Sequence, residues 1–510
     1  MLRSFAASRS GNFALTTALA STALLFAVGF AVDVTNMMSA KSELQSALDA
    51  SLMAASRLGS ADTSRQQTFD SFFAANVEDK RILRDPVAEI VIDESLTSIR
   101  NNAVAYSHVS LRFMPFFNVD PRISVSASTY ESKNDVEIAL VLDNTGSMGE
   151  ARMKALRSAA VDLVDILESS QGGEKARSVK AALIPFVTAV NIKGAGFNED
   201  WIDKTAANPL HGANFDKVGG APVNHLTLFE RLGKEWKGCV EARPEPHNLD
   251  DTAPDRYKPE TLFVPYFAPD EPGVAAGAGN DANAFNNSYL DDLVSGTERV
   301  RQQSAVKYAA TTKNTITDSP PLTNGPNRAC ATPIEPLTED FDKLRTAIKA
   351  MTYWNGSGTN VSEGLAWGRR VLSPGEPFTQ GAAFGSERVA KSVVVFTDGT
   401  NEVFGATNAV INKSDYGAYS FLDQGRMKTT VKSQAVTKVN EWTQTMCTQL
   451  KAQGVEIFTV LLGADTAANR TLYSRCATKP ENYFPTSDVS ELRPIFQRIG
   501  GAIARLQFTN

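Results

Sequence analysis

The sequence predicts a doubly wound α/β domain with a mainly parallel sheet and large insertions, preceded by a long N-terminal transmembrane helix and a small α+β region. Two observations predict the α/β domain. The first is a set of nearly continuous apolar runs, typical of strands buried on both faces of a parallel sheet, at 136–142, 179–187, 392–397 and 456–462. The second is that segments with helical spacing of apolar residues separate these runs, and repeated strand–helix units build a doubly wound sheet.

The chain has 510 residues, which is more than one ordinary domain needs. We expect an N-terminal anchor over 1–56, a small α+β region over 57–134 and the α/β domain over 135–510. Hydrophobic residues make up 42% of the chain, enough for a sizeable core. The net charge of -6 argues against nucleic acid as a partner, because phosphates must be neutralised by Lys and Arg.

Residues 13–32 carry no charge and can cross the hydrocarbon core of a bilayer as one helix of about 20 residues. Arg3 and Arg9 precede this span, and no basic residue follows until Lys41. The positive-inside rule therefore predicts a cytoplasmic N-terminus and an external remainder. A cleavable signal peptide is the alternative, but its apolar core is usually about 7–15 residues long. Because helical spacing of apolar residues continues through 38–52, we expect a retained single-pass anchor in the lipid bilayer.

The region from 57 to 134 has β character. Three segments, 89–93, 103–113 and 122–127, alternate apolar and polar residues as half-buried strands do. Since they follow a helix that begins in the membrane, we expect a small α+β subdomain close to the bilayer.

The helices of the α/β domain each have one apolar face. The first follows the strand 136–142 and presents apolar residues at helical spacing between Met153 and Leu167. Later helices are expected at 338–351, 361–371 and 431–452, with a last one capped by Ser487 and Asp488.

Two stretches interrupt this order, at about 193–335 and 402–428. The first is rich in Gly, Asn, Asp and Pro. We interpret both as insertions, and segments of this length in a compact domain are usually functional or mobile.

The four cysteines, Cys239, Cys330, Cys447 and Cys476, all lie beyond the apolar span. An even number in an exported region predicts disulfides, although three connectivities exist. We favour Cys239–Cys330 and Cys447–Cys476, because each pair brackets one segment. The alternative is four buried free thiols. No Cys-x-x-Cys pair supports a zinc ribbon.

The first buried strand is followed by a D-x-T-x-S motif formed by Asp143, Thr145 and Ser147. Alternate residues of an extended turn point the same way, so these three side chains can converge on one ion. One carboxylate and two hydroxyls suit a hard cation, namely Mg²⁺, Mn²⁺ or Ca²⁺, rather than zinc. The position also fits, because ligands bind at the carboxyl ends of the strands in doubly wound sheets.

Two later loops, around Thr359 and Asp398, resemble the second and third loops of the metal-ion-dependent adhesion site (MIDAS) of von Willebrand factor A (VWA) domains. The resemblance implies a VWA-type, Rossmann-like fold and a divalent cation, foremost Mg²⁺. It also implies that Thr145, Ser147 and Thr359 coordinate through hydroxyls, whereas Asp143 and Asp398 act largely through water. Thr145 stands where Ser is common but keeps the hydroxyl. A VWA fold with a silent site is the alternative.

The whole chain resembles the TadG-type proteins of the TadE/TadG family, which is associated with Flp (tight adherence) pilus assembly. The segments that carry this resemblance are 9–15, 31–34, 43–50, 236–239, 329–330 and 364–368. It implies a bacterial inner-membrane protein with a periplasmic or cell-surface bulk and other Tad/Flp components as partners. Thr16 stands where pilins carry a glutamate, so processing and polymerisation as a pilin are not expected.

The expected function is a non-enzymatic binding module, in which the metal leaves one coordination position for a carboxylate of a partner protein. One alternative is a structural scaffold of the cell envelope whose metal stabilises the fold. A minor alternative is a hydrolase that uses Ser147, but Thr145 replaces the first Gly of G-x-S-x-G. A catalytic triad also needs a histidine, and the four in this chain lie in the membrane-proximal region or the first insertion: His108, His211, His225 and His247.

Overall fold

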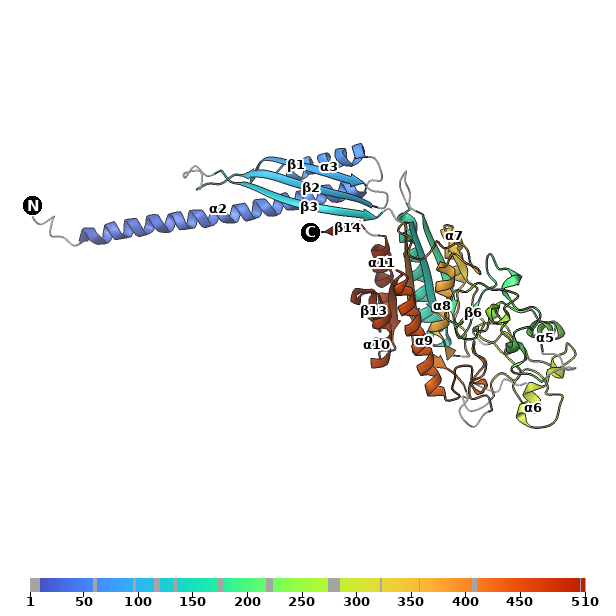
Figure 1. Cartoon of the computed structure of the whole chain (residues 1–510). Helices are drawn as coiled ribbons and strands as arrows, with labels where there is room; N and C mark the ends of the chain where they lie inside the picture. Colours follow the sequence, from blue (N-terminus) through green and yellow to red (C-terminus); the bar gives the residue numbers. More distant parts are fainter. Residues whose placement is uncertain are drawn as a thin grey trace, which may run out of the picture. The chain divides into compact units, whose positions relative to one another are not determined.

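The computed structural model describes residues 10–57, 62–94, 98–113, 120–132, 135–171, 178–216, 223–273, 285–321, 323–356, 358–405, 411–504 and 506–509. They form two compact units (Figure 1). The N-terminal unit is built from the first 134 residues and the C-terminal strand. The C-terminal unit is built from 135–171 and 178–504.

The N-terminal unit has two helices and one antiparallel sheet with the strand order β1-β2-β3-β14. Its elements are α2 (Ser10–Arg57), α3 (Asp62–Val77), β1 (Leu83–Glu94), β2 (Ser98–Val109), β3 (Arg122–Ser132) and β14 (Leu506–Thr509). The predicted strand segments 89–93 and 122–127 lie in β1 and β3 and are confirmed, whereas 103–113 is a strand only as far as Val109, where β2 ends. The sequence does not predict β14, which returns the end of the chain to β3.

The C-terminal half of α2 covers one face of this sheet. Leu44, Leu48 and Leu52 are fully buried and belong to one hydrophobic cluster with Ala103 and Ala105 of β2. The spacing of the three leucines places them on one side of the helix, which explains why this half of α2 packs on the sheet.

The first half of α2 is apolar but exposed. Leu19, Leu24 and Leu25 are 66%, 65% and 70% exposed. By length and composition, α2 is the one helix of the described residues that can cross a membrane. The predicted single apolar span over 13–32 therefore lies within α2, and its residues from 16 to 32 are exposed except Gly29.

The C-terminal unit is centred on an eight-stranded sheet in which five parallel strands, in the order β13-β12-β10-β4-β5, continue into short antiparallel strands. The parallel strands are β4 (Asp135–Asp143), β5 (Val179–Phe186), β10 (Val389–Thr397), β12 (Glu456–Leu462) and β13 (Tyr483–Thr486). The short ones are β6 (Val190–Asn191), β7 (Cys239–Val240) and β8 (Glu335–Thr338). This order confirms the predicted doubly wound, mainly parallel sheet.

Helices cover both faces of the sheet. One face packs on α4 (Gly149–Ser169), α7 (Phe341–Ala350) and α11 (Leu492–Ile503). The other packs on α8 (Val361–Leu372), α9 (Lys432–Ala452) and α10 (Ala467–Cys476). The alternation of β4 serves both cores, because Ile138 and Leu140 face the first cluster whereas Ala139 and Val141 face the second.

The described part of the first insertion has an aromatic core of its own, although it contains little regular structure. Its helices are α5 (His225–Arg231) and α6 (Glu298–Gln303). Phe215, Phe229, Phe267 and Tyr308 contact one another with ring centroids 4.9 to 5.9 Å apart. These rings join the hydrophobic cluster beneath α8, so the insertion extends one face of the domain.

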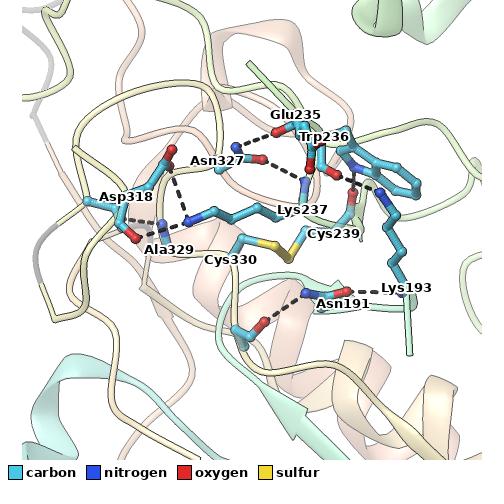
Figure 2. The surroundings of a disulfide bond; sticks show 12 residues. Asn191, Lys193, Glu235, Trp236, Lys237, Cys239, Asp318, Asn327, Ala329 and Cys330 are labelled. Atoms are coloured by element: carbon cyan, nitrogen blue, oxygen red, sulfur yellow. Dashed lines mark hydrogen bonds and ion pairs between the residues drawn. A yellow bond between two sulfur atoms is a disulfide. The ribbon is translucent and has the colours of Figure 1, made fainter. Parts of the chain in front are cut away.

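The structure pairs the cysteines as favoured from the sequence, with disulfides Cys239–Cys330 and Cys447–Cys476. Figure 2 shows that hydrogen bonds accompany the first disulfide. The side chain of Asn327 accepts from the backbone N–H of Lys237 at 3.1 Å and donates to the carbonyl of Glu235 at 2.9 Å. The disulfide and these hydrogen bonds therefore join residues 235–239 to residues 327–330 within the first insertion.

Candidate metal centre

The strands β4 and β10 end side by side, and their ends place two carboxylates together. The strands are parallel neighbours, with Leu142 opposite Phe396. Asp143 is the last residue of β4, and Asp398 follows β10 directly. The sheet register alone therefore brings these two predicted residues to the same edge.

Hydrogen bonds connect four of the five predicted site residues. The backbone N–H and the hydroxyl of Thr145 donate to Oδ1 of Asp143 at 2.8 and 2.6 Å. The hydroxyls of Thr145 and Ser147 are 3.0 Å apart, and Ser147 donates to Oδ1 of Asp398 at 2.7 Å. Since Oδ1 of each aspartate is hydrogen-bonded to a hydroxyl of this pair, the four side chains form one polar cluster.

The fifth residue, Thr359, lies on a separate two-stranded antiparallel sheet formed by β9 (Gly358–Thr359) and β11 (Glu402–Val403). Gly358 has a φ of +95°, and a Cβ there would lie 2.1 Å from the carbonyl oxygen of Glu402. Glycine is thus required where the two strands approach each other. Thr359 is buried, but among the hydrogen bonds of the described residues none joins its side chain to the other four.

A small hollow adjoins this strand pair. Thr359 and Asn360 line it together with residues of the second insertion, among them Tyr419, Arg426 and Met427. The second insertion therefore shapes the surface next to the candidate site.

The carboxylates of Asp143 and Asp398 repel each other. Asp143 is fully buried, and burial, followed by the negative charge of Asp398, raises its pKa to about 7. In the described part of the chain, no three or more His, Cys, Asp or Glu side chains are grouped so that they could hold a metal ion, so hydroxyls must complete a ligand set at this site. Two carboxylates and two hydroxyls held together fit a hard divalent cation.

Two further residues complete the cluster and were not predicted from the sequence. Thr397 donates its hydroxyl to Oδ2 of Asp143 at 2.7 Å. Arg152, on the first turn of α4, forms an ion pair with Oδ2 of Asp398 at 2.5 Å. Thr397 had a signal, because it ends a buried strand beside Asp398. No pattern in the sequence marks Arg152.

Replacing Arg152 by glutamine is expected to strengthen Mg²⁺ binding about tenfold, which corresponds to about 1.4 kcal/mol. The guanidinium group repels a cation placed between the two carboxylates, and glutamine removes the charge but keeps a donor for Asp398. A Mg²⁺ titration followed by calorimetry measures the effect. Lys154→Gln, the same charge change at an exposed position of α4, serves as the control and should leave the affinity unchanged. Weaker binding by Arg152→Gln would mean that Arg152 orients Asp398 for the metal.

The histidines lie apart from Ser147. The hydroxyl of Ser147 contacts Asp398 and Thr145, and no histidine is among its hydrogen-bond partners in the described residues. His211 and His225 are buried against each other in the first insertion, with ring centroids 4.8 Å apart. This arrangement does not support the hydrolase alternative.

The buried His211 is expected to weaken the fold on acidification. Burial, followed by the neighbouring His225, lowers its pKa from 6.5 to about 3. Between these values the unfolded chain binds the proton and the fold does not, so stability falls as the pH drops below 6.5. From pH 8 to pH 5 the loss due to His211 is about 2 kcal/mol.

Urea denaturation of the wild type and of His211→Gln at pH 8 and pH 5 measures this loss. Between pH 8 and pH 5, the unfolding free energy of the wild type should fall by about 2 kcal/mol more than that of His211→Gln. The comparison needs the variant, because burial raises the pKa of Asp143 and Glu271 to about 7, and these carboxyl groups shift stability in the opposite direction. A difference that does not change with pH would contradict the prediction.

Residues 11–57 match the model of the Flp pilus-assembly TadE/G-like family. The match covers α2 from its second residue onward and confirms, for this segment, the resemblance expected from the sequence. Comparison with curated protein sequences finds no match.

Several solved structures match this chain at low identity and low TM-score. The vWF domain of the type V pili tip protein Mfa5 from Porphyromonas gingivalis is 11% identical with a TM-score of 0.33, covering 72% of this chain and 95% of that one. The adhesive tip pilin GBS104 from Group B Streptococcus agalactiae is 11% identical with a TM-score of 0.34, covering 84% and 71%. Proximal thread matrix protein 1 from the mussel byssus is 11% identical with a TM-score of 0.30, covering 74% and 47%. The chain thus spans about half the length of the mussel protein. The doubly wound fold is therefore assigned from the strand order of the sheet and from the helices that cover both of its faces.

Proposed function

We propose that this protein is a membrane-anchored, non-enzymatic module that binds a partner protein through a divalent cation, in Flp pilus assembly or surface adhesion. The cation is foremost Mg²⁺, with Mn²⁺ and Ca²⁺ as alternatives of the same hard type. The residues that would hold it are Asp143, Thr145, Ser147, Thr359 and Asp398. The pilus setting is supported by the TadE/G-like match of residues 11–57.

The observation that carries this proposal is the hydrogen-bonded cluster at the ends of β4 and β10. It holds two buried carboxylates and two hydroxyls against one guanidinium group. When bound, the cation offers an open coordination position to a carboxylate of the partner. The chain contributes fixed oxygens: Thr145 and Ser147 orient the carboxylates, and the burial of Asp143 excludes water behind the site.

We place the anchor in the bacterial inner membrane, with a cytoplasmic N-terminus and the C-terminal unit in the periplasm or at the cell surface. The charges of Arg3 and Arg9 before the span support this orientation. Two disulfides in the C-terminal unit support an oxidising compartment. Other Tad/Flp assembly components are then the candidate partners.

The proposal is tested by affinity capture from bacterial envelope extracts, with the full-length protein held in detergent. We expect a partner to be retained in Mg²⁺ and released by EDTA, and Thr359→Ala to weaken capture without unfolding the protein. Equal capture in EDTA and in excess Mg²⁺ would contradict the proposal. A melting temperature that rises with Mg²⁺, together with metal-independent capture, would instead favour the structural scaffold.

A further inference from the structure

A turn of the N-terminal unit is attached to α2 where the apolar span ends. The turn follows β2, and its backbone N–H groups at Arg112 and Phe113 donate to the carboxylate of Asp33 at 2.9 and 2.8 Å. Asp33 is completely buried and directly follows Val32, the last residue of the uncharged segment. The turn is therefore held at a defined level along α2.

The ring of Phe113 lies over Gly29 of the same helix. A Cβ at position 29 would be 2.6 Å from two carbons of this ring, so the ring fills the space that a side chain would occupy. Gly29 precedes Val32 by three residues, which at the rise of an α-helix places it about 4.5 Å inside the end of the uncharged segment. When residues 13–32 cross a bilayer, Phe113 lies at the depth of the headgroup and acyl-chain boundary.

The surroundings of this ring match a lipid surface. Phe113 is 39% exposed, and Leu25, one helical turn before Gly29 on the same face, is 70% exposed. Other apolar side chains of the span, among them Leu24 and Phe26, are also exposed, and aromatic rings are enriched at the membrane interface. The next four residues of the sequence, 114–117, are Met-Pro-Phe-Phe; they lie outside the described residues and are not part of this site.

We propose that the turn at Phe113 is a second membrane contact, in which the ring enters the lipid interface beside α2. The proposal depends on α2 crossing the bilayer, as the proposed function requires. Its consequence is mechanical. A single helix can tilt in the bilayer at low cost, whereas a second contact fixed to the sheet restrains the N-terminal unit against the membrane surface.

Spin labelling of the full-length protein in phosphatidylcholine vesicles tests the proposal. The four cysteines are held in two disulfides, so one introduced cysteine can be labelled selectively. Phe113→Cys is compared with Leu25→Cys, a lipid reference in the span, and with Val91→Cys, a water reference that is 64% exposed on β1. We expect the ratio of collisions with oxygen to collisions with a nickel chelate to be several-fold higher at 113 than at 91.

The outcomes separate the turn from the anchor. A water-like ratio at 113 with a lipid-like ratio at 25 overturns the second contact and leaves the anchor standing. Water-like ratios at both positions overturn the anchor and the second contact with it. Gly29→Leu should shift the ratio at 113 towards that at 91, because the leucine fills the space over Gly29 in which the label at 113 takes the place of the ring. Ala27→Leu, at an exposed position of the same helix, should leave the ratio unchanged, and equal effects of the two changes would contradict the proposed packing.

Discussion

The Asp398→Asn variant is expected to bind Mg²⁺ at least about 100-fold more weakly than the wild type. Its carboxylate lies 2.7 Å from the hydroxyl of Ser147 and faces the same cluster as Asp143. The number of charged ligands sets the affinity of a hard-cation site, and asparagine removes one of only two charges. Asparagine still accepts from Ser147 and no longer repels Asp143, but it loses the ion pair with Arg152. Because these effects oppose each other, the unfolding free energy without metal should change by about 1 kcal/mol or less.

Thermal melting with increasing Mg²⁺ measures this loss. At a Mg²⁺ concentration of 100 times the dissociation constant, the wild type gains about 2.7 kcal/mol from binding, whereas the variant should gain almost nothing. Asp165→Asn is the matched control, since Asp165 is an exposed aspartate of α4 paired with Arg345. If Asp398→Asn and Asp165→Asn melt alike at every Mg²⁺ concentration, Asp398 is not a metal ligand.

The parts of the fold that the sequence predicts are those governed by local pattern. Runs such as 136–142 are apolar except at Glu137 because β4 and its neighbours are covered on both faces, and helical spacing marks α4 and α9. β14 escapes prediction because a four-residue strand is defined by its partner β3 rather than by its own residues. The first insertion escapes for a similar reason, since its aromatic core is assembled from residues scattered through 215–308.

The residues of the candidate site also differ in whether a local sequence pattern marks them. Asp143 and Asp398 could be predicted because each follows a buried strand, and parallel strands bring their carboxyl ends to one edge. Arg152 could not, because a single arginine on a helix has no pattern that marks its partner. The role of Thr359 as a ligand stays a prediction. Thr359 lies on the β9–β11 strand pair next to the second insertion, and its distance from the cluster depends on tertiary packing.

Removal of the disulfide Cys239–Cys330 by paired serine substitutions is expected to cost about 4–5 kcal/mol of unfolding free energy. The bond closes a loop with a sequence separation of 91 residues, and the entropy that a cross-link removes from the unfolded chain grows with loop length. Much of the described part of this loop lacks helices and strands. Denaturant unfolding and limited proteolysis of the variant with serine in place of Cys239 and Cys330 measure the effect.

The second disulfide closes a shorter loop and serves as the comparison for this prediction. Cys447–Cys476 joins α9 to α10 with a separation of 29 residues, and its removal should cost about 3.5 kcal/mol. The two variants should also fail in different places: the first in the insertion, where new protease cuts should appear between 239 and 330, and the second at α10. Because Asp143 and Asp398 are positioned by β4 and β10, the first variant should keep its Mg²⁺ affinity while its insertion is cut. Loss of metal binding on cleavage would instead show that the insertion, and not the sheet edge alone, holds the site together.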